Sequence, residues 1–492
     1  MKAIIFKAIC VITVLFISLM MYAQSNILTV TGKVIDETGN PLIGVSIMEK
    51  GTDNGTVTNA DGKYSLDVTE NSTLRFSYLG YAAQNIAVGN QQIINVVMDE
   101  GIVIDPAKPI NLTAKQREKT EADNSFAFKM FREVSKEKGT NIFFSPFSLN
   151  IVLGMLYNGS SGNTRTEIAK VLDITNISLP EINEYYNCML NILPEIDPIT
   201  DIVIANSIWY RYGLTVKNSF IETGKKYFNA DVQALDFSNS NTVNIINKWC
   251  VDNTKNRINE MVVNPTPNDR MFILNALYFK SKWEAGKKFD DTRTKLDDFT
   301  KTNGQKIKVN LMEQTNYLPY YSDQNLQCVE LPYGNQAFSM IAILPSEDMD
   351  VNQLIEALGN VKWENIVNGM RQQKVWLKLP QFKIECNISL YQPLMNLGMK
   401  KIFSDGFANI SDASLWVSNI IQKTFVEVNE DGTEASALSA VIVVGFAGQR
   451  RAPDEPVRFF ADRPFLFLIR EKSTGVILFI GRIDEPQAEK QV

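Results

Sequence analysis

Residues 432–448 read GTEASALSAVIVVGFAG, a run of small residues that turns β-branched and carries no charge after Glu434. Strand-like sequence flanks the run on both sides, and no proline occurs between Gly432 and Pro453. A surface loop of this length is normally polar, and a charge-poor, strand-prone loop is an aggregation hazard. The run is therefore either a buried strand already or a segment that becomes a strand later.

One face of such a strand is uniform. Since strand side chains alternate between two faces, every second residue from Thr433 would enter the same side of a sheet. None of these side chains is charged, so their burial has no charge-desolvation cost. The set is Thr433, Ala435, Ala437, Ser439, Val441 and Val443. A mobile Ala/Ser linker is the alternative interpretation, and the β-branched second half argues against it.

Histidine is absent from the 492 residues, and its absence excludes whole classes of enzyme. Ser-His-Asp and Cys-His catalysis, HExxH zinc sites and histidine proton shuttles all need that side chain. The chain also lacks GxGxxG, P-loop and GxSxG sequences. Neighbouring carboxylates such as Asp290 with Asp291 are interpreted as solvated charges. An enzymatic function is therefore the weakest interpretation.

The composition is that of an ordinary globular protein, with 45% hydrophobic and 21% charged residues. The length predicts about two to four domains. The net charge of −6 gives no electrostatic footprint for nucleic acid. No cofactor or metal is expected, because the run from Glu427 that imitates a calcium loop has Leu438 where a bidentate Glu is needed.

Residues 1–23 have the pattern of an export signal. Lys2 and Lys7 form a basic start, residues 8–21 are largely apolar, and Ala23 offers a small residue for cleavage. The apolar run is too short to span a bilayer comfortably, which favours a cleaved signal over a single-pass anchor. The cysteines beyond it lack CxxC spacing and are expected to be buried free thiols; they are Cys188, Cys250, Cys328 and Cys386.

Residues 27–99 consist of short alternating runs separated by turns. The turn signals, such as residues 36–41, recur about every 8–12 residues, which predicts a small all-β sandwich. Residues 100–118 carry prolines and charges without periodicity, and are interpreted as a linker.

From residue 119 to residue 492 the pattern predicts one large mixed α+β domain. A helical period begins at Ala127 and ends at Gly139. Ser148 is expected to cap the next helix, and Thr164 with Glu167 to form a capping box. Later helices are expected at 244–257, 351–359 and 390–397, and apolar strands at 465–469 and 476–480.

The large domain resembles the serpin family of serine protease inhibitors. Residues 141–148 read NIFFSPFS, 275–280 read NALYFK with Trp283 beyond, and 462–465 read DRPF, all of which match family motifs in order. Leu331-Pro332-Tyr333 and Leu379-Pro380 fit further strands. Residues 430–435, EDGTEA, fit the hinge of inhibitory members.

The segment 27–99 resembles the carboxypeptidase regulatory-like domain. The match is carried by Gly32-Lys33-Val34, by Asp61-Gly62-Lys63-Tyr64 and by residues 77–81. Such domains often precede outer-membrane receptors of Gram-negative bacteria. The resemblance therefore implies a β-sandwich and a bacterial, exported protein, and says little about chemistry.

The serpin resemblance implies an α+β fold with a large central mixed sheet, further sheets, about eight or nine helices and an exposed reactive loop. It also implies a suicide-substrate inhibitor and not an enzyme. A protease acylates the loop, and the cut segment inserts into the sheet as a new strand and distorts the trapped protease.

The resemblance implies three groups of site residues. The hinge comprises Glu430, Gly432, Thr433, Glu434, Ala435, Ser436 and Ala437. Ser145, Ser148 and Asn275 belong to the shutter beneath the centre of the sheet, and Trp283 to the breach where insertion begins. Gln422 stands where the family usually has a histidine, and an amide cannot titrate near neutral pH. The reactive bond follows the seventeenth residue counted from Glu430, which places it between Phe446 and Ala447.

A large aromatic residue before the bond predicts chymotrypsin-like targets first, and Val443-Val444-Gly445 predicts elastase-like or papain-like enzymes second. Arg450 and Arg451 lie four and five residues further on, where a cut would leave slack after insertion, so trypsin-like enzymes are predicted mostly to treat the loop as a substrate. The protein is expected to be a monomer without nucleic-acid partners. It is expected to be secreted, periplasmic or on the cell surface, and to contact the cell envelope through the sandwich. Two alternatives stay open: a non-inhibitory serpin acting as an envelope binding or chaperone module, and an envelope adaptor whose sandwich is the working part.

Overall fold

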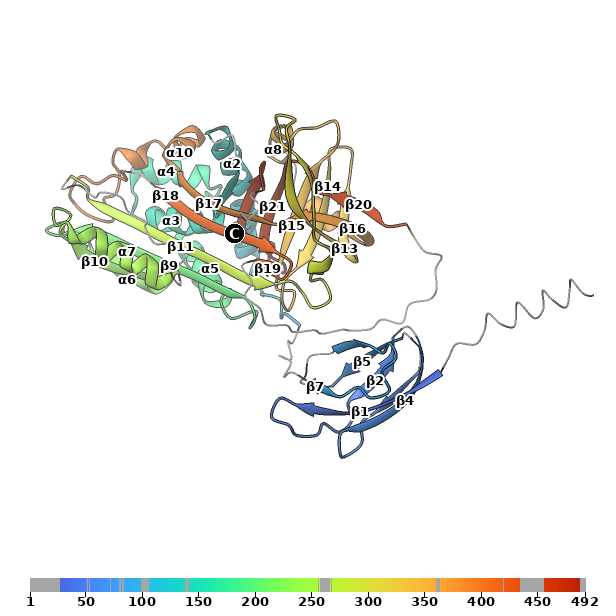
Figure 1. The fold of residues 1–492 in the computed structure, drawn as a ribbon. Helices are drawn as coiled ribbons and strands as arrows, with labels where there is room; N and C mark the ends of the chain where they lie inside the picture. The colour runs from blue at the N-terminus through green and yellow to red at the C-terminus, as the bar shows by residue number, and fades with distance from the viewer. Residues whose placement is uncertain are drawn as a thin grey trace, which may run out of the picture. The chain divides into compact units, whose positions relative to one another are not determined.

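The computed structural model describes residues 27–50, 52, 54–70, 72–78, 81, 84–98, 106–137, 141–254, 256, 266, 268–359, 363–418, 420–433 and 455–486. The chain divides into two compact units (Figure 1). The described residues of the first unit end at residue 98, and those of the second unit begin at residue 106. The predicted export signal, the hinge from Glu434 onward and the Phe446–Ala447 bond lie outside the described residues.

The first unit is a small β domain of two sheets. One sheet has the order β4-β1-β7, and the other has the order β3-β2-β5-β6. The strands are β1 (Ile27–Asp36), β2 (Ser46–Glu49), β3 (Gly55–Val57), β4 (Lys63–Thr69), β5 (Thr73–Ser77), β6 (Gln84–Ala87) and β7 (Val96–Met98). Buried and exposed residues alternate strictly along β4, as expected for a strand with one face on a core. The predicted all-β sandwich is confirmed.

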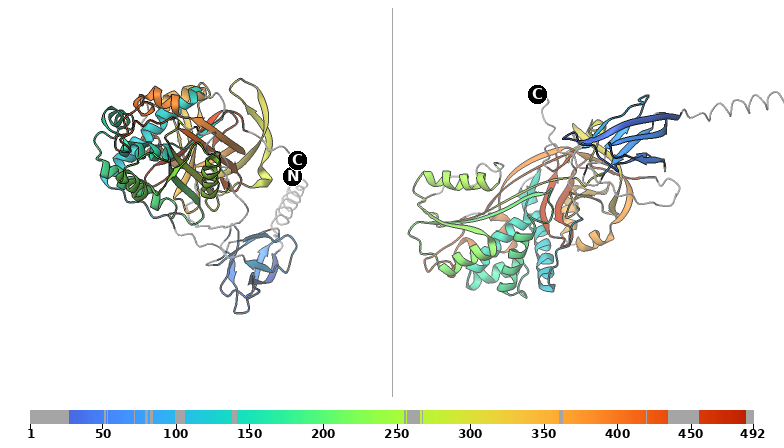
Figure 2. Two further views of the ribbon diagram at one scale, coloured as in Figure 1. Left: turned by 90° about the vertical axis from the view of Figure 1, so that its left-hand side faces the viewer. Right: turned by 90° about the horizontal axis from the view of Figure 1, so that it is seen from below.

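The second unit combines helices with two large sheets. The helices are α2 (Ala114–Glu137), α3 (Pro146–Gly159), α4 (Gly162–Val171), α5 (Leu179–Ile192), α6 (Asn218–Phe228), α7 (Asn241–Asn253), α8 (Val351–Leu358), α9 (Trp363–Gly369) and α10 (Tyr391–Leu397). Figure 2 shows most of these helices gathered at one end of the unit, with strands prevailing at the other. The predicted α+β class is confirmed.

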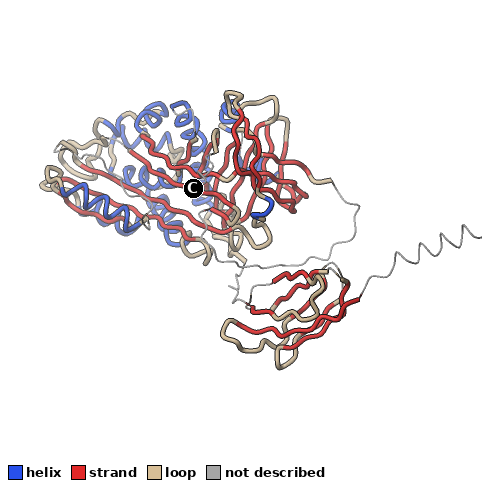
Figure 3. The backbone as a smooth tube through the Cα atoms, in the orientation of Figure 1, coloured by secondary structure: helices blue, strands red, loops and turns tan. Residues whose placement is uncertain are grey.

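A mixed six-stranded sheet forms the long face of this unit (Figure 3). Its order is β10 (Ala230–Leu235), β9 (Asp201–Arg211), β11 (Met271–Lys282), β19 (Gly432–Thr433), β18 (Ile421–Asn429) and β17 (Phe382–Ser389). The pair β10–β9 is parallel, and the other neighbours in the sheet are antiparallel.

A nine-stranded sheet packs behind the first one. Its path is β20 (Val457–Phe460), β16 (Arg371–Pro380), β13 (Lys306–Ser322), β14 (Leu326–Pro332), β15 (Phe338–Pro345), β21 (Phe465–Glu471), β22 (Ile477–Ile483) and β8 (Ile142–Phe144), and β12 (Lys295–Thr300) pairs with β13. Every residue of β15, β21 and β22 is buried, which explains their continuous apolar sequence. The last strands of the chain therefore lie inside the sheet.

Helix α3 lies beneath the six-stranded sheet and is buried almost all round. Its N-cap is Ser145, whose hydroxyl accepts the Ser148 N–H at 3.1 Å, and Pro146 occupies the first turn. The prediction that Ser148 caps this helix is wrong, because Ser148 lies inside the first turn and its side chain bonds to β11.

The predicted capping box of Thr164 and Glu167 is also wrong. Helix α4 has Ser161 at its N-cap; the Thr164 hydroxyl donates to the Asp405 carbonyl oxygen at 3.0 Å. The Glu167 carboxylate accepts the backbone N–H groups of Lys400 and Lys401 at 2.8 and 2.7 Å. Tertiary partners have replaced the local ones that the sequence suggested. Likewise, residues 114–118, interpreted as linker, form the first turns of α2.

Candidate functional site

The hinge begins as a two-residue strand between β11 and β18. Thr433 pairs with Ser281 on β11 and with Val428 on β18, and Gly432 pairs with Lys282 and Asn429 in the same way. Both pairings are antiparallel, so β19 already has the direction and register of a central strand at one end of the sheet (Figure 1). The predicted hinge residues Gly432 and Thr433 are thus seated in the sheet.

Gly432 is required by the closeness of β11. A Cβ atom at this position would lie 2.2 Å from the Ser281 carbonyl oxygen and 2.7 Å from the Lys282 Cα. Both obstacles are backbone atoms and cannot turn aside. Only glycine fits this seat.

Thr433 is buried beside two stacked aromatic rings. Its hydroxyl and the Tyr333 hydroxyl lie 2.5 Å apart, and the ring of Tyr333 stacks on Trp283 with centroids 4.6 Å apart. Burial raises the pKa of Tyr333 far above its usual range, so this hydroxyl stays protonated. Trp283 in turn donates its indole N–H to the Asn429 carbonyl oxygen at 3.0 Å. Trp283, the predicted breach residue, is therefore bonded to the end of β18, just before the turn that precedes the hinge.

The turn itself is fixed by its two acidic residues. The Glu430 carboxylate accepts both hydrogen bonds of the Gln381 side-chain amide nitrogen, at 2.8 and 2.7 Å, and one from the Thr294 hydroxyl. Asp431 forms an ion pair with Lys288, with 2.5 Å between carboxylate oxygen and Nζ. The position from which the loop leaves the sheet is thereby defined.

Beneath the centre of the sheet, Ser148 links α3 to β11. Its hydroxyl donates to the Asn275 side-chain oxygen, and the Asn275 amide nitrogen donates to Asn206 on β9 at 2.6 Å. All three side chains are buried. The structure thus brings the predicted shutter residues Ser148 and Asn275 into direct contact.

Gln422 binds the backbone of Ser145 at two points. The Ser145 N–H donates to the Gln422 side-chain oxygen at 2.7 Å, and the Gln422 amide nitrogen donates to the Ser145 carbonyl oxygen at 2.9 Å. Two residues along β18, the Thr424 hydroxyl donates to the Phe143 carbonyl oxygen at 2.5 Å. Inward side chains of β18 therefore occupy the edge of β8 that does not face β22.

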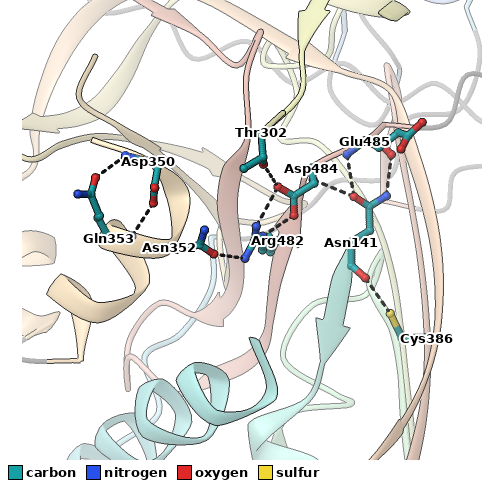
Figure 4. Close-up of polar contacts among 9 residues, drawn as sticks. All are labelled: Asn141, Thr302, Asp350, Asn352, Gln353, Cys386, Arg482, Asp484 and Glu485. Atoms are coloured by element: carbon teal, nitrogen blue, oxygen red, sulfur yellow. Dashed lines mark hydrogen bonds and ion pairs between the residues drawn. The ribbon is translucent and has the colours of Figure 1, made fainter. Parts of the chain in front are cut away.

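Asn141, which opens the NIFFSPFS sequence, fastens the end of β22 (Figure 4). Its side-chain oxygen accepts the N–H groups of Asp484 and Glu485 at 2.8 and 2.9 Å, and its amide nitrogen donates to the Glu485 carbonyl oxygen at 2.7 Å. Next to it, the buried Arg482 and Asp484 form an ion pair. The segment under the sheet is thus tied to the C-terminal strand.

An apolar cavity lies at the far end of β11. It is lined by Val152, Leu156, Met271, Ile273, Phe407, Ile410, Leu415, Trp416, Val417 and Ile420. If the register of β19 continued along the sheet, Val441 would stand opposite Ile273, and Val443 opposite Met271. These loop residues belong to the uncharged set, so the cavity matches them in chemistry.

None of the described cysteines forms a disulfide bond; Cys250, Cys328 and Cys386 are buried and Cys188 is half-buried. Among the residues that the structure describes, no cluster of Cys, Asp and Glu has the arrangement of a metal site. Burial raises the pKa of Cys250 to about 12, which removes thiolate reactivity near neutral pH.

Sequence reasoning missed several side chains of this site: Asn206, Gln381, Thr424 and, as a hinge contact, Tyr333. Each of them bonds to a partner far away in sequence: these partners are Asn275, Glu430, Phe143 and Thr433, respectively. In a single sequence they look like ordinary polar or aromatic strand residues. Only a model of the sheet order would have revealed them.

Comparison with known proteins bears on both units. Residues 121–486 match the family model described as Serpin (serine protease inhibitor), and residues 30–103 match that of the CarboxypepD_reg-like domain. Iripin-3 of Ixodes ricinus is 34% identical over 74% of this chain and 94% of its own length. Serpin B3 of Homo sapiens is 32% identical over 75% of this chain and 99% of its own.

Solved structures agree with this result. The thermophilic serpin tengpin in its native state superposes with a TM-score of 0.68 and 29% identity, covering 77% of this chain and 97% of that one. The structure of cleaved Serpin 42Da gives a TM-score of 0.68 with 27% identity, covering 76% and 100%. The chain belongs to the serpin family, and it carries a carboxypeptidase regulatory-like domain before its serpin domain.

Proposed function

We propose that this protein is an inhibitory serpin that traps endopeptidases covalently. One observation carries the proposal: β19 lies between β11 and β18 and pairs with both. The loop therefore has its first two residues in place, in the antiparallel direction that a new central strand needs. Serpins in general inhibit proteases and are not enzymes.

The register supports insertion of the rest of the loop. Continued from Thr433 opposite Ser281, it sets Ala435 opposite Phe279, Ala437 opposite Leu277 and Ser439 opposite Asn275. The apolar residues meet apolar partners, and the serine meets the polar shutter. An inserted strand would thus bury no unpaired charge.

The proposed reactive bond is Phe446–Ala447. At about 3.3 Å per residue, the segment from Thr433 to Phe446 would extend roughly 45 Å, enough to carry a protease along the sheet. An aromatic residue before the bond favours chymotrypsin-like targets, with elastase-like or papain-like enzymes second.

The decisive experiment is incubation of the purified protein with a protease panel, followed by denaturing electrophoresis. We expect a covalent band at the summed mass of inhibitor and chymotrypsin-like protease. A loop that is cut without any such band, across the whole panel, would favour the non-inhibitory alternative.

We also propose that the protein is exported, on the basis of the signal-like residues 1–23. In the described part of the chain, no helix has the length and apolar character needed to cross a membrane. Fractionation of cells that express the full chain, with N-terminal sequencing of the mature form, tests export. A protein that is found in the cytoplasm and still begins at Met1 contradicts the proposal.

A further inference from the structure

Ser281 is the residue on which the hinge docks. Its carbonyl oxygen is the atom that excludes a Cβ at Gly432, and Thr433 is its partner in the ladder. Its own side chain points into the molecule and is 1% exposed. The interactions that hold Ser281 in place therefore also hold the seat of the hinge, which is the position of Gly432 and Thr433 in the sheet.

A short chain of hydrogen bonds holds Ser281 from below. Its Oγ lies 2.7 Å from the Oγ1 of Thr200, the residue before β9. The Thr200 hydroxyl donates to the Oδ2 of Asp197 at 2.6 Å, and the Ile199 N–H reaches Oδ1 at 3.2 Å. A carboxyl group is thus connected to the hinge seat through two hydroxyls.

Asp197 is enclosed by protein. It is 1% exposed, and a Cβ at Gly334 would lie 2.0 Å from its Oδ2, so the turn between β14 and β15 closes over it. Burial raises the pKa of Asp197, against the lowering effect of hydrogen bonds from Thr200, Ile199 and Asn335. The charged residues on the surrounding elements are Asp201 on β9, Lys280 and Lys282 on β11, Glu284 after β11 and Lys472 after β21.

The ionisation of Asp197 sets the direction of these bonds, because each hydroxyl has a single hydrogen to donate. With Asp197 ionised, Thr200 donates to the carboxylate and Ser281 donates to Thr200. With Asp197 protonated, the carboxyl donates to Thr200 and Thr200 donates to Ser281. The hydrogen of Ser281 is then released toward the Lys282 carbonyl oxygen, which lies 3.4 Å from its Oγ.

We propose that Asp197 is a positioning residue for the hinge, acting through Thr200 on Ser281, so that its protonation loosens the seat of Gly432 and Thr433. Lys282 is the ladder partner of Gly432, and its carbonyl already accepts the Gly334 N–H at 2.9 Å. A competing donor there disturbs the point where the loop enters the sheet. A chain without histidine thereby gains a response to acid. The inference rests on the proposed function.

The first test needs no protease. Trp283 stacks on Tyr333, the partner of Thr433, so its fluorescence reports how the hinge is seated. The difference signal between the wild type and Trp283→Phe is followed from about pH 8 to pH 4, a range that covers a raised aspartate pKa. We expect a transition in the wild type and none in Asp197→Asn or Ser281→Ala. An unchanged transition in Asp197→Asn overturns the proposal.

Two controls make this test specific. Ser339→Ala removes another buried hydroxyl that donates to a carboxylate, that of Glu330, outside the chain of Asp197, Thr200 and Ser281, and should keep the transition. Burial raises the pKa of Glu284 too, and this residue follows Trp283 directly, so Glu284→Gln must also keep the transition. Loss of the transition in Glu284→Gln assigns the response to that residue and overturns the proposal.

The second test uses inhibition. The stoichiometry of inhibition is compared between wild type and Asp197→Asn at each pH with the same protease, so that the pH dependence of the protease cancels in the ratio. We expect the stoichiometry of the wild type, divided by that of Asp197→Asn, to rise about two- to tenfold in acid. This factor is the kinetic equivalent of one hydrogen bond. A flat ratio contradicts the proposal. Absence of any covalent complex contradicts the proposed function instead, and the fluorescence test stays valid.

Discussion

The side chain of Thr433 is the first that the sheet accepts, and its burial determines which residues this position tolerates. We predict that Thr433→Arg converts the inhibitor into a substrate, because an unpaired guanidinium at the 1%-exposed site costs several kcal/mol and slows insertion by orders of magnitude. The stoichiometry of inhibition should rise sharply while the loop is still cut. Thr166→Arg, on an exposed position of α4, is the matched control. Equal stoichiometry in both variants would rule out insertion.

Gln422 belongs to the same scale. We predict that Gln422→Leu lowers the free energy of unfolding by about 1–3 kcal/mol, because it leaves the buried Ser145 N–H without its partner. The Ser145 carbonyl oxygen loses the Gln422 amide but still accepts the Leu149 N–H at 3.2 Å. Denaturant unfolding measures the change. Gln372→Leu, at an exposed position of β16, should cost little. A loss below about 0.5 kcal/mol would show that the two hydrogen bonds to Ser145 are not needed.

Individual residues of the site show which side-chain contacts can be predicted from a sequence. The family motif grouped Ser148 with Asn275, which is 127 residues away and accepts its hydrogen bond. The local pattern misled, because a serine before an apolar helical period looks like a cap. Thr164 and Glu167 failed for the same reason. A hydroxyl or carboxylate can serve a local or a distant partner, and only the fold decides between them.

At the scale of elements, the proposed mechanism makes the length of the inserted strand determine where the protease would be held. We predict that the bond cut in the trapped complex is Phe446–Ala447, so mass spectrometry of the released C-terminal fragment should find Ala447 at its start. Cleavage after Arg451 would leave slack after insertion and let the protease escape. A fragment starting at Ala452, with Phe446→Ala leaving inhibition intact, would place the reactive bond there instead.

Helices and strands with a clear apolar pattern were predicted well from the sequence. The expected helices at 351–359 and 390–397 correspond to α8 (Val351–Leu358) and α10 (Tyr391–Leu397), and the apolar run at 465–469 to β21. The expected helix at 244–257 begins earlier, since α7 spans Asn241–Asn253. The two-residue β19 was not predictable as an element, because its pairing depends on a gap between two strands and not on its own sequence.

At the scale of the whole molecule, β19 supplies only two residues of a strand between β11 and β18. We predict that loop cleavage raises the melting temperature, since a full strand joins the sheet and fills the apolar cavity beside Ile273. Scanning calorimetry of intact and cut protein measures the shift. Identical melting curves would show that the loop stays outside the sheet after cleavage.

The two units have separate hydrophobic cores. We therefore predict that a chain of residues 106–492 folds alone and inhibits with the rate constant of the full chain. The matched partner, residues 24–99, should fold without inhibiting. Localisation of both fragments, each expressed behind residues 1–23, shows which one directs the protein to an envelope. Loss of inhibition in the longer fragment would give the small domain a part in trapping.

The placement of β21 and β22 has a consequence for biosynthesis. They leave the ribosome after every other described strand of the serpin domain, yet they lie between β15 and β8 inside the nine-stranded sheet. Asn141 binds the residues that follow β22. The small domain is synthesised before the serpin domain and can fold early, whereas the serpin domain cannot close its core until β22 has been synthesised. Until then the nascent serpin domain is still open to translocation machinery or to a chaperone.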